Sequence, residues 1–210
     1  MKRLLLTLAL LVSTSVLSLA QIPSWLDHIT PYGFLQGGYS YNSGQDGDNT
    51  NTFYLKRVRL SWMGDLYKNP DFGRLDYRVQ VDFNGSPKLM DLYLRYALCD
   101  EFAVQAGRFK MPLTIENTEY LPLKMEFIDY SLLVQRFAQM SADDLGGVSS
   151  AGRDLGLQFY GNAIRMDDGH PLLSYNIAMF NGAGLGTADD DNLKNVVARV
   201  MAYPVKELCV

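Results

Sequence analysis

Polar and apolar residues alternate with a period of two over long stretches of the chain. Between Arg74 and Asn84 the residues are polar at every even position, and those between them, from Leu75 to Phe83, are apolar. Successive side chains of a β-strand point to opposite faces of a sheet, so this alternation predicts a strand with one apolar and one polar face. The same pattern, strict or weaker, predicts eight strands: Tyr32–Tyr41, Phe53–Met63, Arg74–Asn84, Met90–Leu98, Phe102–Phe109, Asp154–Tyr160, Leu173–Met179 and Lys194–Tyr203.

The lengths of the strands and of their connections favour a membrane protein. Several predicted strands run about nine to eleven residues, as a tilted strand needs to cross a bilayer, whereas strands of soluble proteins have about five or six. The connections tend to alternate between short inner turns and longer outer loops, as in outer-membrane barrels, with a short outer connection at 85–88 as the exception. We therefore expect an all-β fold, an antiparallel transmembrane β-barrel in which residues 110–153 form a long third outer loop.

The N-terminus carries the pattern of an export signal. Lys2 and Arg3 precede an apolar run over residues 4–19, and Ala20 is a small residue before a plausible cleavage site. We expect residues 1–20 to be a signal peptide and residues 21–210 to be the barrel domain in the outer membrane. The alternative is a transmembrane anchor, but the run is short for a membrane span and Pro23 follows it closely.

Composition excludes several functional classes. The chain has 210 residues and a formal net charge of −4, so it lacks the basic footprint of a nucleic-acid-binding protein. Two cysteines and two histidines are too few for a disulfide framework or a histidine-rich metal site. No histidine accompanies a plausible nucleophile, and no carboxylate pair stands out as an acid–base site. We expect no enzymatic activity, no metal, no cofactor and no nucleic-acid partner.

The arginines of the predicted strands fit the polar faces. An arginine that faces lipid near the middle of the membrane costs about 2–4 kcal/mol, whereas an arginine inside the barrel can guide anions with its planar, permanently charged guanidinium. The channel hypothesis takes six arginines as lining the pore: Arg57, Arg59, Arg74, Arg78, Arg95 and Arg199. The alternative is a narrow, filled barrel in which arginines and aspartates neutralise one another. Arg57 and Arg59 have no acidic residue nearby on their own strand face, so they are the better candidates to contact solute.

Two basic residues do not fit the alternation. Lys56 shares the apolar face of its strand, and we expect its side chain to extend to the membrane rim. Arg108 shares a face with Phe102, Val104 and Ala106. Either Arg108 lies at the rim, or a bulge at Gly107 turns it to the other face.

The third outer loop combines basic residues with an apolar centre. The centre, residues 121–140, is rich in Leu, Met, Phe and Tyr, which is too apolar for a loop surrounded by solvent. We expect the loop to fold into the barrel and form a constriction; a surface lid and a subunit contact are the alternatives. Its candidate constriction residues are Lys110, Lys124, Arg136 and Arg153.

An ordered set of short motifs resembles the phosphate-selective porin O and P family. The stretch Gln105-Ala-Gly-Arg-Phe-Lys-Met-Pro112, followed by Glu116, is similar to the G-x-F-K-x-P…E stretch of that family. The other motifs occur in the same order: Phe53-Tyr-Leu-Lys-Arg-Val-Arg-Leu60, Gly152-Arg-Asp-Leu-Gly156, Phe180-Asn-Gly182 and Asp191-Asn-Leu-Lys-Asn195.

The resemblance implies a fold and a transport function. It implies a sixteen-stranded outer-membrane barrel, often trimeric, whose third loop folds into the pore; some members conduct phosphate or polyphosphate. The positions that match are Arg57, Arg59, Lys110 and Arg153. We expect a general or an anion-preferring porin that allows passive diffusion of small hydrophilic solutes, in contact with outer-membrane lipid.

Eight strands are half of sixteen, and the chain stops without the terminal aromatic residue typical of such barrels. Residues 204–208 resemble an inner turn that leads into a ninth strand. We therefore expect the N-terminal half of a porin, trimeric in its full-length form. The alternatives are a small non-conducting barrel that serves as an anchor or adhesin, and a soluble β-protein whose apolar strand faces need a second sheet to cover them. An enzyme of the outer-membrane phospholipase kind is the least favoured.

Overall fold

The computed structural model describes residues 29–42, 50–125, 127, 129–138, 151–185, 189 and 192–204. The predicted signal peptide and residues 205–210 lie outside this part of the chain. All eight predicted strands are present: β1 (Thr30–Asn42), β2 (Thr50–Asn69), β3 (Gly73–Asp82), β4 (Lys88–Cys99), β5 (Phe102–Lys110), β6 (Arg153–Arg165), β7 (Pro171–Phe180) and β8 (Asn195–Ala202). The prediction of an all-β fold is confirmed.

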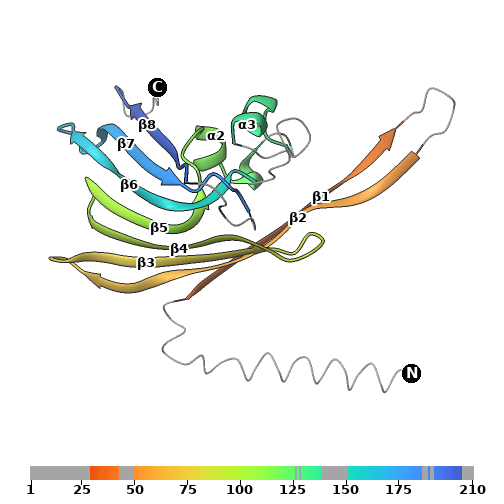
Figure 1. The fold of residues 1–210 in the computed structure, drawn as a ribbon, viewed down its shortest axis with the longest axis horizontal. Helices are drawn as coiled ribbons and strands as arrows, with labels where there is room; N and C mark the ends of the chain where they lie inside the picture. Colours follow the sequence, from red (N-terminus) through yellow and green to blue (C-terminus); the bar gives the residue numbers. More distant parts are fainter. Residues whose placement is uncertain are drawn as a thin grey trace, which may run out of the picture.

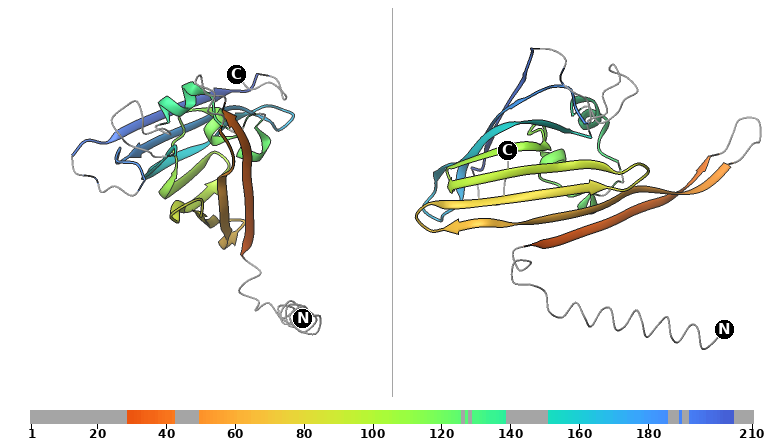
Figure 2. Two further views of the ribbon diagram at one scale, coloured as in Figure 1. Left: turned by 90° about the vertical axis from the view of Figure 1, so that its right-hand side faces the viewer. Right: turned by 60° about the horizontal axis from the view of Figure 1, so that its bottom comes forward.

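The strands form one antiparallel sheet in chain order, in which each strand pairs with the next (Figure 1). The sheet curves, so that β6–β8 turn away from the plane of β1–β4 (Figure 2). It is not closed, because β1 and β8 are its two edges. Among the described residues, no helix has both the length and the apolar character that a membrane span requires.

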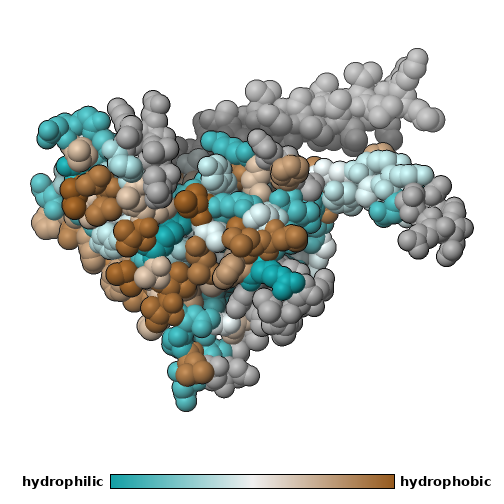
Figure 3. Space-filling model, turned by 90° about the horizontal axis from the view of Figure 1, so that it is seen from above, coloured by the Kyte–Doolittle hydropathy of each residue, from teal (hydrophilic) through white to brown (hydrophobic). Residues whose placement is uncertain are grey.

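The two faces of the sheet differ as the alternation predicts. On β7, Ser174, Asn176 and Ala178 are buried, whereas Ile177 and Met179 between them are exposed. We call the face against which the third loop packs the inner face, and the opposite one the outer face. The outer face exposes large apolar side chains from nearly every strand: Leu35, Leu60, Trp62, Leu92, Leu94, Leu155, Ile177, Met179, Val196 and Val200. Hydrophobic residues also gather in the middle of the surface seen in Figure 3.

Tyrosines on the outer face bond to the short turns at one end of the sheet. The Tyr96 hydroxyl donates to the Phe72 carbonyl at 2.6 Å, and the Tyr175 hydroxyl donates to the Glu101 carbonyl at 2.8 Å. Aromatic side chains with a polar tip are typical of the boundary between lipid and water in outer-membrane barrels. The outer face therefore has an apolar band that ends in tyrosines at the turns.

Two β-bulges change the orientation of side chains that simple alternation places on the outer face. Gln36 pairs with Arg57, and Gly37 pairs with Leu55, so Lys56 is an extra residue in β2. Its ammonium lies 2.5 Å from the Asp129 carboxylate of the third loop, so Lys56 does not have the place on the apolar face from which we expected it to extend to the membrane rim. Met90 is the extra residue in β4 and is buried rather than exposed. A bulge places two residues opposite one and so re-aims the side chains beyond it.

Strand β2 is longer than predicted at its end. It continues past Met63 to Asn69, through a register shift between Asp65 and Tyr67 that interrupts the alternation. At its start, residues 50–58 pair with β1 alone, because β3 joins only from Arg59 onward. The β1–β2 hairpin therefore projects beyond the rest of the sheet (Figure 1).

Candidate functional site

The inner face and the third loop enclose a cavity of about 530 Å³. Of the described residues, seven with basic side chains line it: Arg59, Arg74, Arg78, Arg95, Lys110, Arg153 and Arg199. Three acidic side chains of the described part of the chain also line it: Asp91, Asp100 and Glu119. The strands bring these groups together because alternate residues of neighbouring strands share one face. The cavity is therefore basic, although the whole chain carries a net negative charge.

Asp91 is the centre of a buried network that joins three strands. Arg153 Nε donates to Asp91 Oδ1 at 2.5 Å, and Arg153 Nη2 donates to the side-chain oxygen of Gln80 at 3.1 Å. Arg78 Nε lies 3.5 Å from Asp91 Oδ2. Asp91 and Arg153 are only 3% and 2% exposed. Arg153 thus fixes the end of the third loop to the sheet, and Asp91 neutralises it.

A second aspartate holds two arginines nearer the short turns. Arg95 Nε lies 2.8 and 2.9 Å from the two carboxylate oxygens of Asp76, and Arg74 Nε lies 3.1 Å from the same carboxylate. Asp65 lies farther from Arg74, at 3.6 Å, in an exposed position. Because one buried carboxylate serves two guanidinium groups, this part of the wall keeps positive charge facing the cavity.

Arg57 and Arg59 both have side-chain partners, and these come from other elements rather than from their own strand face. Arg59 Nε donates to Asp82 Oδ2 at 2.8 Å, and Asp82 comes from the neighbouring strand β3, directly opposite Arg59. Arg57 donates to the Gln36 side chain at 2.5 Å, and its guanidinium lies over the Tyr130 ring, 5.6 Å from the centroid. Arg57 is absent from the described residues that line the cavity.

The third loop begins with short helical segments, α2 (Ile115–Thr118), η2 (Pro122–Lys124) and α3 (Leu132–Phe137). Thr114 caps α2 by accepting a hydrogen bond from the Asn117 amide, and Ser131 caps α3 in the same way at Val134. The Glu116 carboxylate accepts hydrogen bonds from the Ser131 backbone and hydroxyl, each at 2.7 Å. These contacts give the start of the loop a defined shape.

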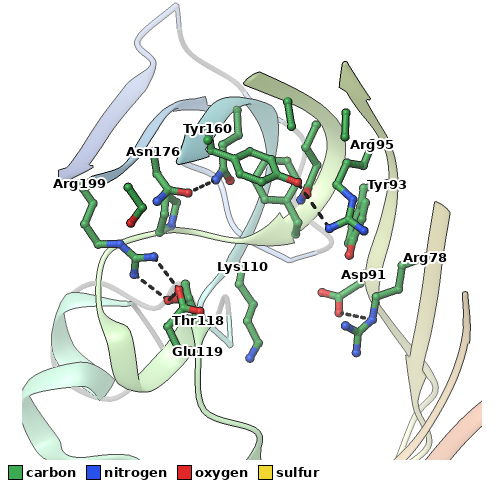
Figure 4. A pocket seen from close by; sticks show the side chains of 18 of the residues that line it. Arg78, Asp91, Tyr93, Arg95, Lys110, Thr118, Glu119, Tyr160, Asn176 and Arg199 are labelled. Carbon is green, nitrogen blue, oxygen red and sulfur yellow. Dashed lines mark hydrogen bonds and ion pairs between the residues drawn. The ribbon is translucent and has the colours of Figure 1, made fainter. Parts of the chain in front are cut away.

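Side chains from several strands tie this loop to the inner face. Lys110 Nζ donates to the Asn117 carbonyl at 2.5 Å. Arg199 of β8 donates to the Thr118 hydroxyl at 2.7 Å and to Glu119 at 2.8 Å. With the Lys56–Asp129 ion pair of β2, these contacts attach the loop to both halves of the sheet. In Figure 4, Lys110 lies between the Arg199–Glu119 contact and the Arg78–Asp91 contact.

Two of the candidate constriction residues lie elsewhere. Lys124, in η2, and Arg136, in α3, are exposed, and neither is among the described residues that line the cavity. Lys110 and Arg153 do line it, and they pair directly with each other where the loop leaves and rejoins the sheet.

Some residues that line the cavity were not predicted from the sequence. Gln158 Nε2 donates to Asn176 Oδ1 at 2.6 Å, and Tyr160 lies near Arg95 on the same wall. The alternation places each of them on the polar face of its predicted strand. Because their side chains are uncharged, nothing distinguished them from the other residues of that face. Glu119 gave no such signal, since its position depends on how the loop folds.

An apolar cluster adjoins the basic wall at the root of the loop. Phe109 packs against Phe180 with ring centroids 5.2 Å apart and against Tyr93 at 6.2 Å. Met111 and Ala178 complete its buried part. The cluster lies where the loop leaves β5, and its members Tyr93 and Phe109 also line the cavity.

The excess of basic side chains makes the cavity suited to attracting anions. Basic groups that outnumber acidic ones in a concave site raise the local concentration of anions. In the described part of the chain, no group of three or more His, Cys, Asp or Glu residues is placed to hold a metal ion.

Comparison with known proteins gives one match. The model of the phosphate-selective porin O and P family matches residues 30–184, which is more than half of the chain and includes all of β1–β7. No curated protein and no solved structure matches the chain.

Proposed function

The chain belongs to the phosphate-selective porin O and P family, an outer-membrane porin family, and from this premise we propose that it lines a channel for passive diffusion of small hydrophilic anions. The substrate class includes inorganic phosphate and small carboxylates, because a guanidinium binds such groups through two parallel hydrogen bonds. The transport needs no chemical step.

One observation carries the anion preference. Among the described residues, seven basic side chains but only three acidic ones line the cavity, and Asp76 and Asp82, which pair with its arginines, still leave the basic groups in excess. Partly buried charges are screened by salt less than exposed ones, and a cavity with low-dielectric walls concentrates their field. Anions therefore enter this space more readily than cations.

The third loop supports selection by size as well as by charge. Its first helical segment lies over the inner face, and Pro112, Thr118 and Leu121 of the loop line the cavity. We propose that Lys110, Arg153 and Arg199 act where the loop narrows the path. Lys124 and Arg136 have no part in this proposal.

The alternative of a small non-conducting barrel requires β1 to pair with β8. In the described sheet these strands are the edges, and lipid does not tolerate unpaired strand edges. We propose instead that both edges pair with further strands of a larger barrel. Trimer formation and cleavage after Ala20 belong to the same proposal and are supported by the resemblance and by the N-terminal pattern.

The test is ion selectivity in a planar bilayer, measured as the reversal potential across a KCl gradient. We choose Arg74→Gln with Lys110→Gln, because Asp76 keeps Arg95 as a partner when Arg74 is neutralised. The anion-to-cation permeability ratio should be above one and should move toward one in this variant. Lys68→Gln is the control, since Lys68 is exposed and is not among the described residues that line the cavity. An unchanged ratio in the double variant would refute the proposal.

A further inference from the structure

One arginine lies on the outer face. Arg108 pairs with Leu92 of β4 on one side and with Leu155 of β6 on the other, with no register shift at Gly107. Both leucines are about half exposed, at 49% and 48%. The sequence left two alternatives for Arg108, a position at the membrane rim or a bulge at Gly107. The regular pairing on both sides excludes the bulge. The guanidinium lies in a row of apolar side chains that face lipid.

A groove runs beside this arginine. Its volume is about 610 Å³, and its floor is low because Ala106 and Gly107 have little or no side chain. The apolar lining comes from five strands: Leu66, Val79, Leu89, Leu92, Leu94, Ala106 and Leu155. Such a depression can accommodate an acyl chain.

The guanidinium of Arg108 is poorly satisfied by protein. Its one hydrogen bond to the described residues, from Nη1 to the Leu89 carbonyl, is long at 3.3 Å. Its Nε atom is buried and lacks a hydrogen-bond partner among the described residues. By contrast, the arginines of the inner face lie within ion-pair distance of carboxylates: Arg59, Arg74, Arg78, Arg95, Arg153 and Arg199. A lipid-facing cation is costly unless an anion meets it.

We propose that Arg108 and this groove bind one anionic phospholipid, with the phosphate on the guanidinium and an acyl chain along Leu89, Leu92 and Leu94. Charge complementarity and the adjoining apolar surface together identify the occupant, because a free phosphate would use the cation but not the groove. Arg108 is near the end of β5 from which the third loop starts, so the phosphate lies at the membrane rim on that side. The inference depends on the membrane location of the porin and not on its ion preference.

The test is lipid retention measured by native mass spectrometry of the full-length protein in a neutral detergent. Phosphatidylglycerol and phosphatidylcholine with the same acyl chains are titrated separately. A hydrogen-bonded ion pair changes an equilibrium by about tenfold, so phosphatidylglycerol should bind about tenfold more tightly. Arg108→Gln should remove this preference, and Arg108→Lys should keep most of it. Arg165→Gln, which removes a charge already paired with Asp100, should not change it.

A second variant tests the groove independently of the charge. Ala106→Phe fills the floor while Arg108 stays in place, and Ala106 faces outward, so the fold accommodates the ring. Retention of both lipids should fall.

Equal affinity for the two lipids, an unchanged preference in Arg108→Gln, or unchanged retention in Ala106→Phe each overturns the proposal. So does displacement of the lipid by an equal concentration of inorganic phosphate, because that identifies a simple anion site. Bilayer selectivity can fail or hold without affecting these outcomes.

Discussion

Arg153, the first residue of β6, reaches across β5 to place its Nε atom 2.5 Å from Asp91 Oδ1 of β4. The pair therefore skips one strand, and it connects the end of the third loop to the middle of the sheet. Gln80 of β3 extends the contact by accepting from the same guanidinium. One buried carboxylate thus fixes where the loop rejoins the sheet.

Asp91→Ala should destabilise the protein strongly. The substitution leaves the buried Arg153 without its carboxylate and removes the partner of Arg78. Loss of one member of a buried ion pair costs about 3–5 kcal/mol, because the other charge stays buried and uncompensated. The measurement is the free energy of unfolding in urea, with the protein in lipid vesicles.

The matched control for this variant is Asp65→Ala. Asp65 also pairs with an arginine, Arg74, but at 3.6 Å and with both side chains about 40% exposed. An exposed pair contributes less than about 1 kcal/mol. If the two alanine variants lose similar free energies of unfolding, then the buried position of Asp91 does not have the importance assigned to it.

Arg199→Ala should loosen the loop more than Glu119→Ala does. Arg199 donates both to Thr118 and to Glu119, so the glutamate variant keeps one of the two contacts. We expect a loss of about 1–2 kcal/mol for the arginine variant and less than about 1 kcal/mol for the glutamate variant. A double-mutant cycle on unfolding free energies measures the coupling. Strictly additive losses would show that the two side chains do not interact.

Gly107→Ala should cost more than Gly85→Ala. Both glycines have positive φ angles, +129° and +79°. A Cβ at Gly107 would also lie 2.2 Å from the Leu92 carbonyl oxygen, whereas nothing lies within 4 Å of a Cβ at Gly85. We expect about 1 kcal/mol at Gly85 from backbone strain alone and at least twice that at Gly107. Equal losses of unfolding free energy in urea would contradict the clash.

The anion preference should weaken as salt rises. The Debye length falls from about 10 Å at 0.1 M to about 3 Å at 1 M, so the field of Lys110 and Arg74 reaches less of the cavity. The anion-to-cation permeability ratio should therefore be lower near 1 M KCl than near 0.1 M. A ratio that is independent of salt would indicate selection by direct contact with the permeating ion rather than by the field.

The sheet could be predicted from the sequence because the alternation of polar and apolar residues lies within each strand. Alternation from Leu75 to Phe83 shows both that β3 exists and which residues it exposes. The bulges at Lys56 and Met90 could not be predicted in this way, because one extra residue shifts the alternation between the two faces by one position. The lysine among apolar residues was in hindsight the sign of the first bulge.

The candidate site was predictable in kind but not in detail. The basic inner face follows from the alternation, which places Arg74 and Arg78 on one side of β3. The partners of these arginines depend on register and on the path of the loop. Arg59 pairs with Asp82, and Arg153 pairs with Asp91, which is 62 positions away in the chain. No pattern within a single strand contains that information.

The strand order also has a consequence for the kinetics of folding. Every pairing in the sheet joins neighbours in the chain, and most of these are connected by short turns, so β1–β5 and β6–β8 can each form by successive hairpins. Only the β5–β6 pairing must close the long segment 111–152, which costs about 2 kcal/mol more in loop-closure entropy than a turn of a few residues. The two groups of strands should therefore form first, and their joining, completed when Arg153 reaches Asp91, should limit the rate.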